Sequence, residues 1–264
     1  MVSVEQVKKY WEENTPQYWY SNKEEGSKEY YDDIQRVRYS EVYTYLPKLA
    51  EFDKHAGKKV LEIGCGQGTD LLQYAKSGSK VFGTDLTEAA IKKTKQMFLV
   101  YGIDADLRVC NAEDLKCFED NSFDIVYSFG VIHHTPETQK CIDDIRRVLK
   151  PGGKAFVMIY AKGLNYLFKL FYNHILQGGF LKYSLVETIS GHSEYKRKCP
   201  LTKMYSKRQA RKMFSAFKNV KIRKKHNPQF RDILPLPIFK MMPKHLYEIF
   251  QRIFGDNLMI SCEK

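Results

Sequence analysis

The sequence lacks the features that would place it among secreted or membrane-spanning proteins. Met1 to Asn14 is polar and offers no apolar core for a signal peptide. No apolar run approaches the about eighteen residues that a transmembrane helix requires. The six cysteines contain no C-x-x-C pair, so neither a disulfide framework nor a zinc knuckle is indicated. Together these absences favour a location in the reducing cytoplasm.

Acidic residues are scarce between Lys162 and Lys225. This segment holds sixteen Lys or Arg but only two acids, Glu187 and Glu194, and its net charge of +14 exceeds the +12 of the whole chain. The remainder is therefore close to neutral. Such a basic segment is either solvated surface or a region that meets an anionic substrate, a membrane surface or nucleic acid.

Length and composition fit one folded unit. At 264 residues the chain can bury a full core as one α/β domain. A hydrophobic content of 43% and a charged content of 28% are ordinary for a soluble globular protein. No internal repeat or disordered linker divides the sequence, so we expect a single domain over residues 1–264.

The stretch from Lys58 to Leu86 organises the rest of the chain. Residues 60–63 form a short, mostly apolar run, which predicts a parallel strand buried on both faces. Gly64, Gly66 and Gly68 follow, and glycines allow positive φ angles and a close approach of the backbone to a bound molecule. We expect a helix from Thr69 to Lys76 and a second strand over residues 81–84.

The glycine spacing discriminates between ligands. A dinucleotide fingerprint has glycine at its first, third and sixth positions, and the sixth position here is Thr69. The pattern is instead E-x-G-x-G-x-G, with Glu62 two places before the first glycine. Asp85 ends the second strand, where a carboxylate can receive the two hydroxyls of a ribose. A tight turn without a ligand is the alternative.

Further signals follow in order along the chain. We expect a helix capped by Thr87 that ends near Gly102, then further strands and helices. The predicted elements are a strand over 107–110, a loop over 111–115, a strand over 121–128, a helix over 136–149, a turn over 149–154 and a strand over 155–160.

Five motifs, in this order, resemble those of the class I S-adenosylmethionine (SAM)-dependent methyltransferases. They are the glycine turn, the acid at 85, the Asn111-Ala112-Glu113 segment, the S-F-D-x-V strand and the L-K-P-G-G turn. The resemblance is closest to the ubiquinone/menaquinone-type branch of small-molecule methyltransferases. It implies an α/β fold, a Rossmann-like seven-stranded sheet with one antiparallel strand and helices on both faces.

The resemblance also divides the domain into parts. They are an N-terminal helical lid over residues 1–50, a SAM-binding core over 51–160, a substrate-cap insertion over 161–205 and a C-terminal completion of the sheet over 206–264. The lid is expected to contain helices over Val4–Glu13 and Lys28–Leu46. Aromatic packing against the core is the alternative to closure over a cofactor.

The cap carries an apolar stripe from Leu164 to Ile175 at helical spacing, and ordinary core packing is its alternative reading. In the C-terminal part we expect a helix over 206–217 capped by Ser206, strands over 219–226 and 257–262, and a helix over 243–254.

The cofactor implied is SAM, with S-adenosylhomocysteine as its product. By resemblance, the cofactor-binding residues are Glu62, Gly64, Cys65, Gly66, Gly68, Asp85, Leu86, Asn111, Ala112, Glu113, Phe129 and Tyr18. Asn111 stands where the family usually has an aspartate that reads the adenine. Its amide can still accept from the adenine amino group, and Glu113 or Asp114 can replace it.

Methyl transfer requires alignment above all, because the sulfonium of SAM is already a strong electrophile. A base is needed only where the acceptor loses a proton, and His133 and His134 are the candidates. Either histidine can instead shape the start of the following helix. Tyr18, Tyr20 and Tyr160 are weaker candidates for orienting substrate. We expect no metal.

The sequence thus predicts a SAM-dependent methyltransferase acting on a small acceptor, amphiphilic or anionic in character. The acceptor atom (O, N or C) and the oligomeric state stay open. The basic segment raises two further readings: peripheral contact with an anionic membrane, and an RNA or protein substrate. No nucleic-acid module supports the RNA reading. A SAM-binding protein without activity is the remaining alternative.

Overall fold

The computed structural model describes most of the chain. The described residues are 2–14, 20–163, 171, 175, 178, 181, 199–225, 243, 245–246 and 255–264. Most of the predicted helix over 243–254, most of the substrate cap, and Tyr18 lie outside them.

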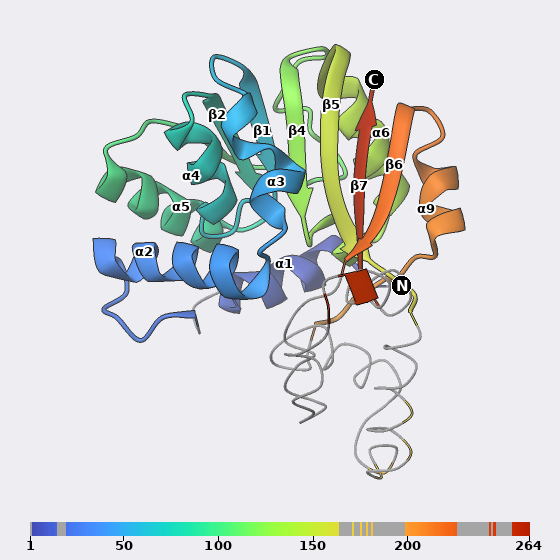
Figure 1. Cartoon of the computed structure of the whole chain (residues 1–264), viewed down its shortest axis with the longest axis horizontal. Coiled ribbons are helices and arrows are strands. Elements are labelled where there is room, and N and C mark those ends of the chain that lie inside the picture. The colour runs from blue at the N-terminus through green and yellow to red at the C-terminus, as the bar shows by residue number, and fades with distance from the viewer. Residues whose placement is uncertain are drawn as a thin grey trace.

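A seven-stranded sheet forms the centre of the described structure, in the order β3-β2-β1-β4-β5-β7-β6 (Figure 1). Its strands are β1 (Lys59–Ile63), β2 (Lys80–Asp85), β3 (Asp106–Val109), β4 (Phe123–Phe129), β5 (Leu149–Tyr160), β6 (Lys218–Lys225) and β7 (Asn257–Glu263). β7 runs antiparallel to both of its neighbours, and the other pairs are parallel. The predicted sheet with one antiparallel strand is confirmed.

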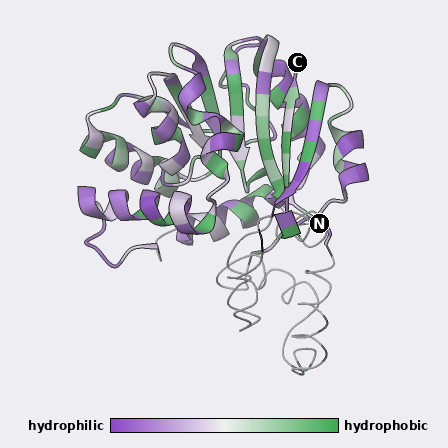
Figure 2. Ribbon diagram, viewed as in Figure 1, coloured by the Kyte–Doolittle hydropathy of each residue, from purple (hydrophilic) through white to green (hydrophobic). Residues whose placement is uncertain are grey.

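Helices cover both faces of this sheet (Figure 1). The α-helices of the described residues are α1 (Val4–Glu13), α2 (Lys28–Val37), α3 (Leu46–Ala50), α4 (Thr69–Lys76), α5 (Glu88–Tyr101), α6 (Thr138–Val148) and α9 (Lys207–Met213), of which α1 lies at the ends of the strands rather than on a face. Successive strand residues enter different hydrophobic clusters, because side chains alternate between the two faces of a strand. Leu61 packs in the cluster that holds α6 and α9, whereas Val60 packs in the cluster with α2, α4 and α5. Figure 2 shows the hydrophobic strands inside and the hydrophilic helix surfaces outside.

Local capping fixes where several helices begin. Ser3 and Gln6 form a capping box at α1, and Ser206 and Gln209 form another at α9. The Thr87 side chain accepts a hydrogen bond from the Ala90 N–H at the start of α5. The predicted caps Thr87 and Ser206 are confirmed, although α9 ends at Met213 rather than near residue 217.

The helix predicted over Lys28–Leu46 is interrupted. It ends as an α-helix at Val37, continues as a π-helix over Arg38–Val42, and is followed by the separate helix α3. Pro47 lies in the first turn of α3, where its missing N–H costs nothing. The π-helix coincides with a buried Arg38, whose side chain points to a partner in α4.

The L-K-P-G-G turn is also different from its prediction. Its residues belong to β5, in which Leu149 pairs with Phe123 and Lys154 pairs with Ile125 across a register shift. The chain therefore accommodates the glycines as an irregularity within a long strand.

A disulfide joins Cys110 to Cys117, which the cysteine spacing did not predict. The other four cysteines are buried, and none of them forms a disulfide with another described residue. A separation of seven residues resembles neither a C-x-x-C pair nor a disulfide framework, so the pairing follows from the fold of the loop that follows β3.

Candidate active site

The carboxyl ends of β1, β2, β3 and β4 meet at one edge of the sheet, and α1 lies across that edge (Figure 1). Trp11 of α1 packs edge-on against His134, with ring centroids 5.2 Å apart. Its neighbour Glu12 accepts the Ala89 N–H of α5 at 2.8 Å through Oε1. Helix α1 thus contacts both the segment that follows β4 and the start of α5.

The glycine turn joins β1 to α4 at this edge. Gly64, Gly66 and Gly68 have φ values of 74°, 57° and 83°, which disfavour residues with a Cβ. A Cβ on Gly68 would also lie 2.7 Å from Thr94 Cγ2. The turn is closed by a 2.7 Å hydrogen bond from the Gly68 N–H to the Cys65 carbonyl. Its backbone therefore requires glycine for geometric reasons as well as for access.

Asp85 ends β2 and lies against this turn. Its carboxylate accepts the Gly66 N–H at 3.1 Å, the Thr87 N–H at 3.0 Å and the Thr87 hydroxyl at 2.8 Å. Burial raises the pKa of Asp85, and these hydrogen bonds oppose the rise. Leu86 follows, half-buried, at the entrance to α5.

Glu62 is buried at the other end of the turn, with 4% of its surface exposed. Its Oε2 has no hydrogen-bond partner among the described residues. Burial raises the pKa of Glu62 well above its usual value, Asp70 adds to the rise, and Arg38 opposes it. Buried carboxylate oxygens are normally paired, so this atom is suited to receive a donor from a bound molecule.

An ion-pair cluster that the sequence did not reveal lies beneath the turn: Arg38, Tyr39, Asp70 and Tyr127. Arg38 Nε and Nη2 donate to the two oxygens of Asp70 at 2.7 and 2.6 Å. The hydroxyls of Tyr39 and Tyr127 donate to the same carboxylate at 2.6 and 2.7 Å. Burial raises the pKa of Asp70, but the Arg38 charge and these hydrogen bonds lower it below its usual value.

Phe129, a predicted cofactor residue, contacts this cluster. The guanidinium of Arg38 lies 4.9 Å from the ring centroids of both Phe129 and Tyr43. The signal that would have revealed the cluster is Asp70 itself. It is a charged residue on the buried face of α4, and a buried charge requires a partner.

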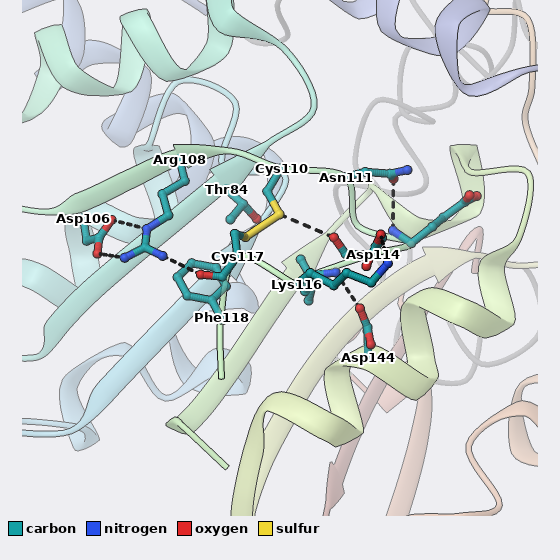
Figure 3. Close-up of a disulfide and its surroundings, with 12 residues drawn as sticks. Thr84, Asp106, Arg108, Cys110, Asn111, Asp114, Lys116, Cys117, Phe118 and Asp144 are labelled. Carbon is teal, nitrogen blue, oxygen red and sulfur yellow. Dashed lines mark hydrogen bonds and ion pairs between the residues drawn. A yellow bond between two sulfur atoms is a disulfide. The ribbon is translucent and has the colours of Figure 1, made fainter. Parts of the chain in front are cut away.

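The loop after β3 forms the next part of the edge (Figure 3). Asn111 Oδ1 accepts the Glu113 N–H at 3.0 Å, and Ala112 is 7% exposed. Glu113 Oε1 accepts the Glu137 N–H at 2.6 Å, next to the start of α6. Asp114 is exposed and pairs with Lys116. Of the two acids in the loop, Glu113 is therefore engaged at the start of α6, and Asp114 is engaged by Lys116.

His133 and His134 follow β4 in a short 3-10 helix, Ile132–His134. His133 is fully buried, and its ring lies 4.0 Å from that of Tyr160. Neither of its ring nitrogens has a hydrogen-bond partner among the described residues. Burial, and then the neighbouring His134, lower the pKa of His133 well below its usual value, so its imidazole is neutral.

His134 is held by the last residues of the predicted cap segment, 199–202. Its Nδ1 lies 2.8 Å from the Leu201 carbonyl oxygen, and a carbonyl can only accept a hydrogen bond. Nδ1 therefore carries the proton in the neutral ring, and Nε2 is the basic nitrogen. Cys199 Sγ and Thr202 Oγ1 each lie 3.5 Å from the same Nδ1.

In the part of the chain that the structure describes, no group of three His, Cys, Asp or Glu side chains is arranged to hold a metal ion. No helix within that part has the length and apolarity needed to cross a bilayer.

Tyr20 is half-buried near the ion-pair cluster, and burial raises its pKa.

Comparison with known proteins relates this site to one family. Residues 61–157 match the family model described as a methyltransferase domain. A ubiquinone biosynthesis O-methyltransferase of Xanthomonas euvesicatoria is 35% identical over 39% of this chain and 43% of its own length. A cycloartenol-C-24-methyltransferase of Arabidopsis thaliana is 39% identical over 36% of this chain and 29% of its own. The chain thus spans less than half the length of these relatives.

Solved structures resemble the fold. Phosphoethanolamine N-methyltransferase 2 of Haemonchus contortus, in complex with S-adenosyl-L-methionine, has a TM-score of 0.56 and 20% identity over 84% of this chain and 51% of its own. The [4+2]-cyclase SpnF has a TM-score of 0.61 and 16% identity over 99% of this chain and 96% of its own. At these identities the likeness concerns the fold alone. Because a cyclase and a methyltransferase both resemble this chain, the fold does not determine the reaction.

Proposed function

We propose that the protein transfers the methyl group of SAM to a small acceptor. The chain carries a domain of the class I SAM-dependent methyltransferase family, near its ubiquinone branch. The predicted family, fold and enzyme class are confirmed at that level. The acceptor and the roles of individual residues are our proposals.

The unpaired Oε2 of Glu62 carries the cofactor proposal. It is buried beside the glycine turn, where an unpaired carboxylate oxygen costs free energy unless a ligand supplies a donor. The ammonium of the methionine part of SAM is such a donor. The glycine turn would then face the central part of the ligand.

Two further contacts complete this binding mode. Asp85 would accept a ribose hydroxyl, and Asn111 and Ala112 would meet the adenine. These assignments agree with the order of the residues along the edge, because Asp85 ends β2 and the loop follows the neighbouring strand β3. Cys65 and Leu86 would line the same path through backbone and apolar contacts.

When bound, SAM would supply the electrophilic methyl group. The chain's own contribution is to orient the acceptor, to exclude water with α1, and to remove a proton where the acceptor has one to lose. His134 Nε2 is the proposed proton acceptor, since the Leu201 carbonyl fixes the proton on Nδ1. His133, neutral and enclosed, would support the His134 ring rather than act as the base.

The acceptor is proposed to be small, amphiphilic or anionic. The described basic residues favour this class: Lys203, Lys207, Arg208, Arg211, Lys212, Lys218, Lys221, Arg223, Lys224 and Lys225, with no acid between 199 and 225. Phe171 and Ile175 of the predicted stripe are 52% and 50% exposed, which fits an apolar surface open to a ligand or a membrane. The other stripe residues, with Arg197 and Lys198, lie outside the described residues.

Calorimetry tests the cofactor proposal. SAM and S-adenosylhomocysteine should bind at micromolar levels or tighter, which corresponds to about 8 kcal/mol. Asp85→Ala should weaken this by about 1.5–3 kcal/mol, because a hydrogen bond to a charged group is lost. Unchanged affinity in that variant, or tight NAD binding by the parent, would refute the assignment. Mass spectrometry of molecules that remain bound through purification addresses the acceptor.

Kinetics test the proposed base. For a hydroxyl, phenol or acidic carbon acceptor, His134→Ala should lower kcat by about 10²–10⁴ with little change in S-adenosylhomocysteine affinity. An unchanged kcat would mean that proximity alone drives the reaction.

Peripheral membrane contact stays a separate proposal. Cosedimentation with anionic vesicles should exceed that with neutral vesicles and should fade with salt, since each nearby Lys or Arg adds roughly 1 kcal/mol. Charge reversal at Arg211 should weaken that preference, and equal partitioning to both vesicle types would rule it out.

A further inference from the structure

The Cys110–Cys117 pair differs from the other cysteines in accessibility. Both members are half-buried, whereas the exposed fractions of Cys65, Cys141 and Cys262 are 5%, 0% and 4%. Burial also raises the pKa of Cys141 and of Cys262 to about 12, which disfavours their reactive thiolates. Reagents in solution therefore reach Cys110 and Cys117 in preference to the buried thiols.

The two cysteines bracket the proposed adenine-binding loop. Asn111 follows Cys110 directly. Its side-chain Oδ1 accepts the Glu113 N–H at 3.0 Å, and its backbone carbonyl accepts the Asp114 N–H at 3.0 Å. Figure 3 shows the sulfur–sulfur bond lying beside this loop. The disulfide therefore closes a small ring that contains the residues proposed to meet the adenine.

The first end of the ring touches the proposed ribose site. The Cys110 N–H donates to the Asp85 carbonyl at 2.8 Å. Cys110 is thus connected through one backbone hydrogen bond to the residue whose carboxylate would hold the ribose.

The second end is anchored independently of the sulfur. The Cys117 carbonyl accepts a hydrogen bond from the guanidinium of Arg108, which also pairs with Asp106 at 2.6 Å. Arg108 lies 4.8 Å from the ring centroid of Phe118, and the buried Leu115 donates its N–H to Asp144. Both ends of the loop have contacts that do not depend on the disulfide, so the two sulfurs should stay close when the bond opens. The Cα atoms of Cys110 and Cys117 are 6.9 Å apart in the closed form.

We propose that Cys110 and Cys117 form a reversible redox site that regulates cofactor affinity, an inference that rests on the proposed function. Oxidation requires a small disulfide such as glutathione disulfide. One protein thiolate attacks it and releases one thiol, and the other protein thiolate then attacks the mixed disulfide and releases a second. The protein loses two electrons and two protons, and the small disulfide becomes two thiols. A dithiol reductant reverses the reaction.

The oxidised form binds the cofactor more tightly. The disulfide restricts the backbone of residues 110–117 before the ligand arrives, so less conformational entropy is lost on binding. In the reduced form the loop retains more freedom, and binding must order it. The ends of the loop stay anchored in both forms, so we expect a modest difference of about three- to tenfold in Kd.

The test compares the full chain in two redox states. One sample is equilibrated with glutathione disulfide and the other with a dithiol reductant, and alkylation followed by peptide mass spectrometry locates the free thiols. Calorimetry with S-adenosylhomocysteine should give a Kd about three- to tenfold lower for the oxidised sample.

Two variants make the result specific. Cys110→Ser/Cys117→Ser should show the reduced-form Kd in both buffers, whereas Cys262→Ser, in β7, should keep the difference. Circular dichroism confirms that each variant is folded. Equal Kd values in the two states, or free thiols at 110 and 117 after oxidation, would overturn the redox proposal alone. Absence of binding in both states would instead refute the proposed function.

Discussion

Two buried carboxylates lie on opposite sides of the glycine turn, and they differ in their partners. Asp70, 3% exposed, receives hydrogen bonds from Arg38, Tyr39 and Tyr127. Glu62, 4% exposed, has an oxygen without a partner in the described part of the chain. Accordingly the pKa of Asp70 is lowered and that of Glu62 is raised.

The difference separates structure from ligand binding. A carboxylate with a bidentate arginine and two tyrosines is complete, so its ionised form belongs to the folded protein alone. A carboxylate with an unpaired oxygen is incomplete and is suited to accept a ligand's cation. Burial is nearly equal at the two positions, so the partners make the distinction.

The largest expected effect comes from breaking the completed site. Asp70→Ala leaves the Arg38 charge buried without its partner, and the free energy of unfolding should fall by about 3–5 kcal/mol. Urea denaturation measures this loss. The hypothesis that Asp70 is structural would be contradicted by a stable variant whose only defect is weaker cofactor binding.

Glu62→Gln should show the opposite behaviour. Loss of the charge should weaken S-adenosylhomocysteine binding by about 1.5–3 kcal/mol, the range for hydrogen bonds to charged groups. Stability should be unchanged or higher, because the variant no longer buries an ionisable group without a full set of partners. Calorimetry and urea denaturation of the same preparation decide the matter. A large loss of stability with unchanged affinity would reverse the assignment.

Arg38→Lys is a smaller perturbation of the same cluster. The charge remains, but lysine cannot form the bidentate pair with Asp70 or stack between Tyr43 and Phe129. We expect a loss of about 1–2 kcal/mol in the free energy of unfolding. Lys28→Arg is the matched control, because Lys28 pairs with Asp32 at an exposed site. This control variant should change the free energy of unfolding little.

The sequence predicted what depends on neighbours along the chain. Thr87 and Ser206 cap helices through residues three places ahead, and such signals survive without tertiary information. The glycine turn and Asp85 were predicted for the same reason, since both terminate short apolar strands.

Tertiary contacts account for what the sequence did not predict. The π-helix at Arg38–Val42 accompanies the pairing of Arg38 with Asp70, thirty-two residues away, and no local pattern encodes that pair. The Cys110–Cys117 bond likewise depends on how the loop after β3 folds back. Leu201, which fixes the tautomer of His134, reaches it across a sequence separation of sixty-seven.

The smallest effects concern pH, and the two carboxylates should respond with opposite signs. The folded pKa of Asp70 lies below the ordinary value of 3.8, so its contribution to stability is present above 3.8 and is lost as pH falls through the folded pKa. The folded pKa of Glu62 lies above the ordinary value of 4.5, so its contribution to stability is greatest below 4.5 and is lost as pH rises through the folded pKa. The limiting slope for one group is about 1.4 kcal/mol per pH unit.

A pH series on the parent and Glu62→Gln separates these contributions. Urea denaturation from about pH 4 to about pH 8 should show a steeper fall in parent stability above pH 4.5 than in the variant, in which Asp85 still has a raised pKa. Cofactor binding should follow the same group. An ammonium beside Glu62 favours the carboxylate, so S-adenosylhomocysteine affinity should rise with pH more steeply in the parent than in the variant. If the affinity of both proteins is independent of pH while stability changes as expected, Glu62 is a buried acid that the ligand does not contact, and the cation of the cofactor must be bound elsewhere on the edge.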